Sequence, residues 1–128
     1  MPRLLVIDDD TDLRAVVTEY LLSLGYEVDQ AAEREEAEAL CEHYTYSLVI
    51  TDISLTELGV EGFDLLRTIS SSNARPKLIV VSGHAGFRHR ELAKQCGADM
   101  FLVKPISLAR LGEAVHTCLL LQQEQKAS

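Results

Sequence analysis

The stretch Leu4-Leu5-Val6-Ile7-Asp8-Asp9-Asp10 places four aliphatic residues directly before three acids. A short apolar run of this length is typical of a strand that is buried on both faces. Apolar residues then recur at helical spacing from Leu13 to Leu24, and Gly25 marks the predicted end of that helix. The chain therefore opens with a strand followed by a helix, the first half of a βαβ unit.

The same alternation recurs four more times along the chain. Further strands are predicted at 27–31, 47–51, 78–81 and 100–103, each followed by a segment with helix-like spacing of apolar residues. This pattern predicts an α/β, flavodoxin-like (βα)5 doubly wound fold with a five-stranded parallel sheet. Strands one, three and four are almost wholly apolar and suit the centre, whereas the polar second strand suits an edge. The expected strand order is 2-1-3-4-5.

Length and composition fit one domain over residues 1–128. The chain is 47% hydrophobic and 25% charged, the balance of an ordinary globular protein, and its polar tail at about 122–128 is expected to fray. No apolar run approaches the roughly 20 residues of a membrane span, and no signal peptide is recognised. We therefore expect a cytoplasmic protein that does not contact membranes. The net charge of −8 disfavours direct binding to nucleic acid.

Several side chains suggest only packing. The three cysteines (Cys41, Cys96 and Cys118) are odd in number and widely spaced, so buried thiols are predicted rather than a disulfide framework or a zinc site. Three aromatic residues at helical spacing are expected to lie in the core or to be half-buried: Tyr20, Tyr44 and Phe63.

Polar side chains gather where the predicted strands end. Asp8, Asp9, Asp52, Ser82 and Lys104 all lie at or just past a carboxyl end. Because these ends share one edge of a parallel sheet, three carboxylates, a hydroxyl and an ammonium group should converge on one cleft. Crowded carboxylates repel each other and need a cation, and an all-oxygen ligand set suits Mg²⁺.

Five segments resemble the response-regulator receiver family of two-component signalling, in its stand-alone, chemotaxis-receiver-like form. They are 5–10, 48–52, 80–83, 101–103 and the step Lys104-Pro105. The spacing of 30 residues from Asp52 to Ser82, and of 22 from Ser82 to Lys104, is similar to that of the family. The resemblance covers essentially the whole chain.

The resemblance implies roles for the residues of the cleft. Asp52 would be the phosphoacceptor, and Mg²⁺ would be held by Asp8, Asp9, Asp52 and the backbone carbonyl of Ser54. Lys104 would neutralise charge on the phosphoryl group as it is transferred. The peptide bond between Lys104 and Pro105 would be cis.

Further residues would carry the response to phosphorylation. Ser82 would donate its hydroxyl to a phosphate oxygen and draw its loop inward, which leaves room for Phe101 to rotate. This switch would remodel a partner-binding face of helix four, strand five and helix five. Phe101 lacks the hydroxyl of the family's frequent Tyr, so its inward state should cost less here. Ser54 and His84 occupy positions that tune phosphate lifetime, although both could equally be exposed loop residues.

The implied function is a switch in a phosphorelay rather than an enzyme, since only its own aspartate is phosphorylated and dephosphorylated. A sensor histidine kinase or histidine phosphotransferase would supply the phosphoryl group, and a downstream protein would read it, with homodimerisation on phosphorylation as a further outcome. No output domain is expected after the last helix, although a receiver cut from a larger hybrid kinase remains open. Thr56, where the family has Pro, and Gly62, ten residues past Asp52, suggest a two-residue insertion.

Other functions fit the residues less well. Asp8, Asp10, Asp12 and Glu19 match positions one, three, five and twelve of a calcium-binding EF-hand loop, but Leu13 stands where the turn needs Gly. An aspartyl-nucleophile phosphatase would need Thr or Val at the fifth position of its motif. A flavodoxin-like FMN carrier would place Ser, Thr and Gly, not acids, beside its phosphate. The acids alone could also be a solvated turn and helix cap.

Overall fold

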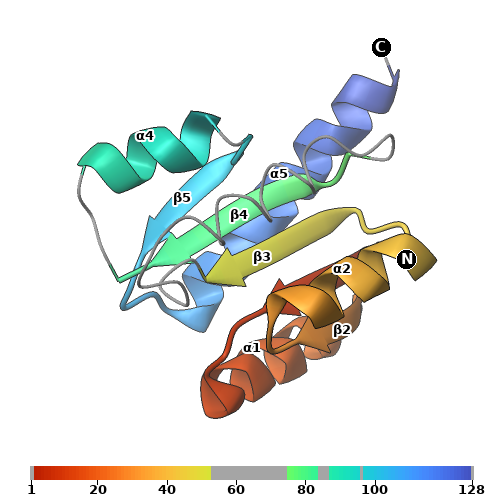
Figure 1. Ribbon diagram of the computed structural model, residues 1–128. Coiled ribbons are helices and arrows are strands. Elements are labelled where there is room, and N and C mark those ends of the chain that lie inside the picture. The colour runs from red at the N-terminus through yellow and green to blue at the C-terminus, as the bar shows by residue number, and fades with distance from the viewer. Residues whose placement is uncertain (1, 53–74, 84–86, 96, 128) are drawn as a thin grey trace.

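A computed structural model describes residues 2–52, 75–83, 87–95 and 97–127 of the chain. Strands and helices alternate along these ranges, apart from the step from β3 to β4, between which residues 53–74 are not described (Figure 1). The elements are β1 Arg3–Ile7, α1 Thr11–Ser23, β2 Glu27–Ala31, α2 Arg34–His43, β3 Leu48–Asp52, β4 Lys77–Ser82, α4 Phe87–Gln95, β5 Met100–Val103 and α5 Leu108–Ala127.

The strands form one five-stranded parallel sheet in the order β2-β1-β3-β4-β5. The predicted fold class and strand order are confirmed. All five residues of β3 are buried, as a central strand between two helix layers requires. β2 lies at an edge and carries exposed and half-buried residues, which its polar composition indicated.

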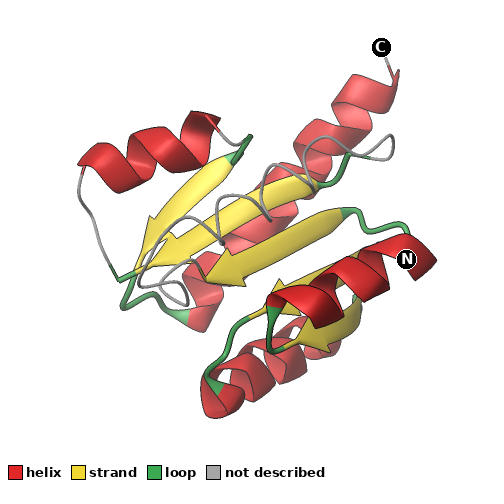
Figure 2. Ribbon diagram, viewed as in Figure 1, coloured by secondary structure: helices red, strands yellow, loops and turns green. Residues whose placement is uncertain are grey.

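Helices cover both faces of the sheet (Figure 2). Alternate residues of β1 point to opposite sides, so that Leu4 and Val6 pack with side chains of α1 and α5. Leu5 and Ile7 pack on the other side, in the cluster that holds Ala37 of α2 and Ala93 of α4. The sheet is therefore the middle layer of three, and its carboxyl edge emerges between the helices.

The termini of the helices follow from particular residues. Asp10 caps α1, because its side chain accepts a hydrogen bond from the Leu13 amide. After α1 the chain turns at Gly25, whose φ of 98° lies in the left-handed region that favours glycine. Ser107 accepts a hydrogen bond from the Arg110 amide at the start of α5.

α5 continues to Ala127, and its last residues include Gln, Glu, Lys and Ala, which favour helix, so fraying of this tail stays a prediction. One expectation from the sequence was wrong. Tyr44 is 44% exposed rather than buried, because α2 ends at His43 and Tyr44 already has an extended backbone. Tyr20 is half-buried as expected.

Other expectations concern thiols, membranes and one turn. Cys118 is a buried free thiol and Cys41 is a partly buried one. Among the helices of the described ranges, none combines the length and the apolar character that crossing a membrane would require. The Lys104–Pro105 peptide bond is cis. Thr56, Gly62, Phe63 and Cys96 lie outside the described residues.

Candidate functional site

The strand register brings the predicted site residues to one edge. Ile7 of β1 pairs with Thr51 of β3, so the next residues along, Asp8 and Asp52, emerge side by side. Asp52 in turn pairs with Val81 of β4, directly before Ser82. The parallel sheet thus gathers side chains that are far apart in the chain.

The three polar residues at these strand ends are buried. Asp8 is 6% exposed, Asp52 is 4% exposed and Ser82 is fully buried, whereas Asp9 lies at the surface. A buried carboxylate is costly unless a cation or hydrogen-bond donors compensate its charge. Two of them at neighbouring strand ends make this a site that needs positive charge.

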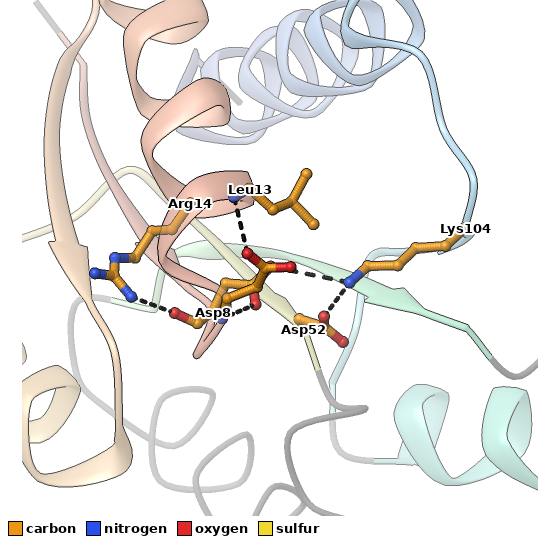
Figure 3. A network of polar contacts seen from close by, with 6 residues as sticks. Asp8, Leu13, Arg14, Asp52 and Lys104 are labelled. Carbon is orange, nitrogen blue, oxygen red and sulfur yellow. Dashed lines mark hydrogen bonds and ion pairs between the residues drawn. The ribbon is translucent and has the colours of Figure 1, made fainter.

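Lys104, just after β5, supplies such a charge. Its ammonium nitrogen donates a hydrogen bond to Asp52 Oδ2 and lies 3.9 Å from Asp8 Oδ2 (Figure 3). The backbone amide of Lys104 also donates to the Ser82 carbonyl oxygen at 2.8 Å, which ties the start of this loop to β4. One ammonium group is therefore shared between two acids.

The pKa values reflect this crowding. Burial raises the pKa of Asp8, and the charge of Asp52 adds to the effect, while the hydrogen bond from the Asp10 amide and the charge of Lys104 oppose it. Burial would lower the pKa of Lys104, but its hydrogen bond to Asp52 and the charges of both acids outweigh burial and raise it. Lys104 is accordingly held in its charged form.

The turn between β1 and α1 holds Asp8 by several hydrogen bonds. Asp8 Oδ1 accepts from the Asp10 amide at 2.9 Å, and the Asp8 backbone oxygen accepts from the Arg14 guanidinium at 2.7 Å. Sequence reasoning missed Arg14, because nothing in the sequence distinguishes it from an ordinary arginine on a helix surface. Asp10, an acid of the alternative calcium loop, serves as the cap of α1.

The acids and Lys104 also form the polar end of a cavity of about 410 Å³. Apolar side chains of β1, β3, β4, α1 and α5 line the rest of it, including Leu13 and Leu108. The low polarity around the acids and Lys104 strengthens their mutual electrostatic interactions.

The remaining predicted residues are distributed differently. Phe101 on β5 is half-buried, pairs with Val80 and lies under the Arg90 guanidinium of α4, 5.1 Å from the ring centre. It is not part of the acidic edge. Ser54 and His84 lie outside the described residues.

The donor set is compatible with Mg²⁺. Within the ranges that the structure describes, no three His, Cys, Asp or Glu side chains are already gathered around a common point. Asp8 and Asp52 nevertheless offer buried oxygen donors at adjacent strand ends, and Mg²⁺ commonly takes only one or two carboxylates and keeps several waters. Their two charges exceed that of Lys104, which leaves net negative charge for a cation.

Residues 4–116 match the family model described as the response regulator receiver domain. The chain belongs to this family. It is 34% identical over 104 residues to the gliding motility regulatory protein of Myxococcus xanthus, a match covering 80% of this chain and 13% of that protein. It is 31% identical over 117 residues to the transcriptional regulatory protein CusR of Escherichia coli K12, covering 91% of this chain and 51% of that protein.

A solved structure agrees with the receiver assignment. The CheY-like receiver domain protein of Methanospirillum hungatei has a TM-score of 0.90 to this receiver at 30% identity, with 98% of each chain covered. The two curated relatives differ in being longer, since the chain spans 13% of one and 51% of the other. The shared unit is the receiver domain.

Proposed function

We propose that this receiver is a phosphorylation-controlled switch in which Asp52 accepts a phosphoryl group in a Mg²⁺-dependent reaction. The observation that supports this most directly is the position of Lys104, whose ammonium group contacts buried Asp52 and faces buried Asp8. A lysine that only neutralised one aspartate would not need the second carboxylate. The extra negative charge supports a site for an additional cation.

The chemistry is transfer of a phosphoryl group from a donor to the Asp52 carboxylate. A carboxylate oxygen of Asp52 attacks the phosphorus of a phosphohistidine or of acetyl phosphate, and the new P–O bond forms as the bond to the donor breaks. The donor's imidazole or acetate leaves with the electron pair. Charge spreads over the three equatorial oxygens during transfer, so positioning and neutralisation dominate catalysis. Lys104 would supply the positive charge, and the buried Ser82 hydroxyl would donate to one of these oxygens.

Asp8, Asp9, Asp52 and the backbone carbonyl of Ser54 would hold the Mg²⁺ ion. When bound, it would neutralise charge on the phosphoryl oxygens and orient them. The residues themselves position the reaction. The buried end of β3 fixes the Asp52 carboxylate, and the β1–α1 turn fixes that of Asp8.

The response would pass through Ser82 and Phe101. Ser82 ends β4 and Phe101 lies on the adjacent strand β5, so a shift of Ser82 toward phosphate would change the space beside the Phe101 ring. The face of α4, β5 and α5 would then bind a different partner or a second copy of the chain. Ser54 and His84 would tune the lifetime of the phosphoryl group.

The proposed partners follow from this role. A sensor histidine kinase or a histidine phosphotransferase would donate the phosphoryl group, and a downstream protein would read the altered face. Direct contact with nucleic acid is not proposed, given the net charge of −8. The setting would be the cytoplasm, and the protein would turn over no separate substrate, which makes it a switch rather than an enzyme.

Intact-mass spectrometry after incubation with acetyl phosphate tests the proposal. One added phosphoryl group is expected in the presence of Mg²⁺, and none with Mg²⁺ removed or in Asp52→Asn. Asp99→Asn is the matched control, because Asp99 also lies close to a lysine, Lys77, at 3.7 Å. Asp99 directly precedes β5 and therefore lies at the amino ends of the strands, away from the site. An adduct that persists in Asp52→Asn, or is lost in Asp99→Asn, would contradict the assignment of Asp52.

A further inference from the structure

Three of the four polar groups of Asp8 form hydrogen bonds, and the fourth, Oδ2, forms an ion pair. Its amide donates to the Ala31 carbonyl oxygen at 3.1 Å, and its Oδ1 accepts from the Asp10 amide at 2.9 Å. Its backbone oxygen accepts from Arg14 at 2.7 Å. No hydrogen bond from the described residues reaches Oδ2, which forms an ion pair with Lys104 at 3.9 Å. The direction of that oxygen is therefore set by three hydrogen bonds made elsewhere on the residue.

Arg14 is the one side chain among these three contacts. It lies in the first turns of α1 and is half-buried, and it reaches Asp8 from the side away from Lys104 (Figure 3). Its Nε also donates to Gln30 Oε1 on the edge strand β2, at 3.2 Å. The guanidinium thus connects α1, the β1–α1 turn and β2, which its rigid planar fork of donors allows and a lysine could not reproduce.

We propose that Arg14 is a positioning residue for the cation site: by holding the Asp8 backbone oxygen, it aims Asp8 Oδ2 at the space that a divalent cation shares with Asp52. This inference rests on the proposed function, because it assigns a role to Arg14 within the same metal site. It adds a residue that neither binds the metal nor contacts the phosphoryl group.

Charge and geometry predict opposite effects of removing Arg14. The guanidinium is a cation close to a cation site, so its charge alone disfavours metal binding, and a neutral residue there should bind metal more tightly. If Arg14 instead positions Asp8, the neutral variant should bind metal less tightly. The sign of the change in metal affinity therefore distinguishes an effect of the Arg14 charge from a positioning role of Arg14.

The test is Mn²⁺ binding to the unphosphorylated full chain, measured by the electron paramagnetic resonance signal of free Mn²⁺. Arg14→Gln should weaken Mn²⁺ binding about tenfold, the low end of what loss of an outer-shell partner costs at metal sites. Arg14→Lys, which keeps the charge and one donor, should recover part of the loss. Gln30→Ala is the matched control and should change the affinity less than about twofold, because the bond from Arg14 to Asp8 remains.

A second readout follows the turn itself. Exchange of the Asp10 amide hydrogen, which bonds to Asp8 Oδ1, should be faster in Arg14→Gln and unchanged in Gln30→Ala. Unchanged or tighter Mn²⁺ binding in Arg14→Gln would overturn the inference, as would equal weakening in Gln30→Ala. If the unmodified chain bound no Mn²⁺ and took no phosphoryl group, the proposed function would fail instead. If the unmodified chain bound Mn²⁺ and was phosphorylated, the Arg14 variants would test only the role of Arg14.

Discussion

At Lys104, one ammonium group faces the carboxylates of both Asp52 and Asp8, where a divalent cation would also bind. The lysine and the metal therefore compete for the same negative charge, although both would stabilise the transferred phosphoryl group. Lys104→Met should tighten Mg²⁺ binding about fivefold, close to 1 kcal/mol, a modest value since the lysine is partly exposed. The same change should slow phosphorylation by about 100-fold, because a preorganised charge is lost.

Calorimetric titration with Mg²⁺ and the rate of adduct formation from acetyl phosphate measure these two effects separately. Lys77→Met removes the lysine at the amino end of β4 and serves as the control. Weaker Mg²⁺ binding in Lys104→Met would mean that the lysine holds the acids in place rather than competing with the metal.

On the edge strand β2, the environment of Asp29 predicts a pH dependence of stability. Burial would raise its pKa, but hydrogen bonds from Arg3 at 2.8 Å and from the Tyr46 hydroxyl at 2.7 Å outweigh burial, so the pKa lies below its ordinary value. A depressed folded-state pKa gives stability that is complete above the unfolded value, about 3.9, and is lost as pH falls through the folded value.

At pH 7 the unmodified chain should therefore have a larger free energy of unfolding than Asp29→Asn. This difference should shrink as the pH falls below about 4. Urea unfolding at a series of pH values measures it. A difference that did not vary with pH would show that Asp29 acts through packing rather than through its charge.

Between elements, α1 and α5 pack closely at Gly112. A Cβ atom there would lie 3.0 Å from Tyr20 Oη, 3.1 Å from Tyr20 Cε2 and 3.3 Å from Leu24 Cδ1. Ala would gain about 1 kcal/mol of helix propensity, but displacing Tyr20 from the core cluster against which it packs should cost more, about 1–3 kcal/mol.

Gly112→Ala should accordingly destabilise the unmodified chain and stabilise a Tyr20→Leu background, with a coupling of about 1–2 kcal/mol. A double-mutant cycle by chemical denaturation measures this coupling. Additive effects would mean that the two helices move apart without cost.

The start of α2 offers a gain in stability. Glu33 occupies its N-cap position with extended backbone, and its side chain makes no capping hydrogen bond. Glu33→Ser should stabilise the protein by about 0.5–1 kcal/mol, because the short Ser side chain can accept a hydrogen bond from an amide of the first turn. Glu33→Ala should give no gain in the same unfolding measurement, and an equal gain would point to relief of charge repulsion rather than to capping.

The elements themselves were largely predictable from the sequence. The apolar runs of β1, β3 and β4 became buried strands because helices cover both faces of the sheet, and the polarity of β2 marked it as an edge. The exposure of Tyr44 was misjudged because helical spacing was extended past His43, where α2 ends.

At the site, the sequence predicted which residues meet but not how they are held. Asp8, Asp52 and Lys104 were found because strand ends share an edge. The contact of Arg14 with a backbone oxygen was not predictable, since a backbone acceptor leaves no trace in the residue pattern. Nor does any residue pattern specify that one ammonium group faces two acids.

Across the whole molecule, burial is uneven in a way that bears on switching. β3 is buried throughout, whereas Leu102 is the only buried residue of β5, and Ala93 is the only buried one among the described side chains of α4. β2 and α2 have equally little buried surface, with Ala31 and Ala37 as their buried residues, but Ser82 pairs with Val103 of β5 and lies away from them. Segments with little buried surface open and shift most easily.

The phosphorylated state should therefore differ from the resting state mainly in α4 and β5, and little in β2 and α2. Beryllofluoride, which mimics the phosphoryl group, should produce amide chemical-shift changes beyond the acceptor site that concentrate in 90–103. Ser82→Ala should still form the adduct, but those distant changes should shrink, because the buried hydroxyl that we propose to respond to the phosphoryl group beside β5 is gone. Changes of equal size in β2 and α2 would mean that the sheet responds as one rigid body, and that closeness to Ser82 does not decide where the switch lies.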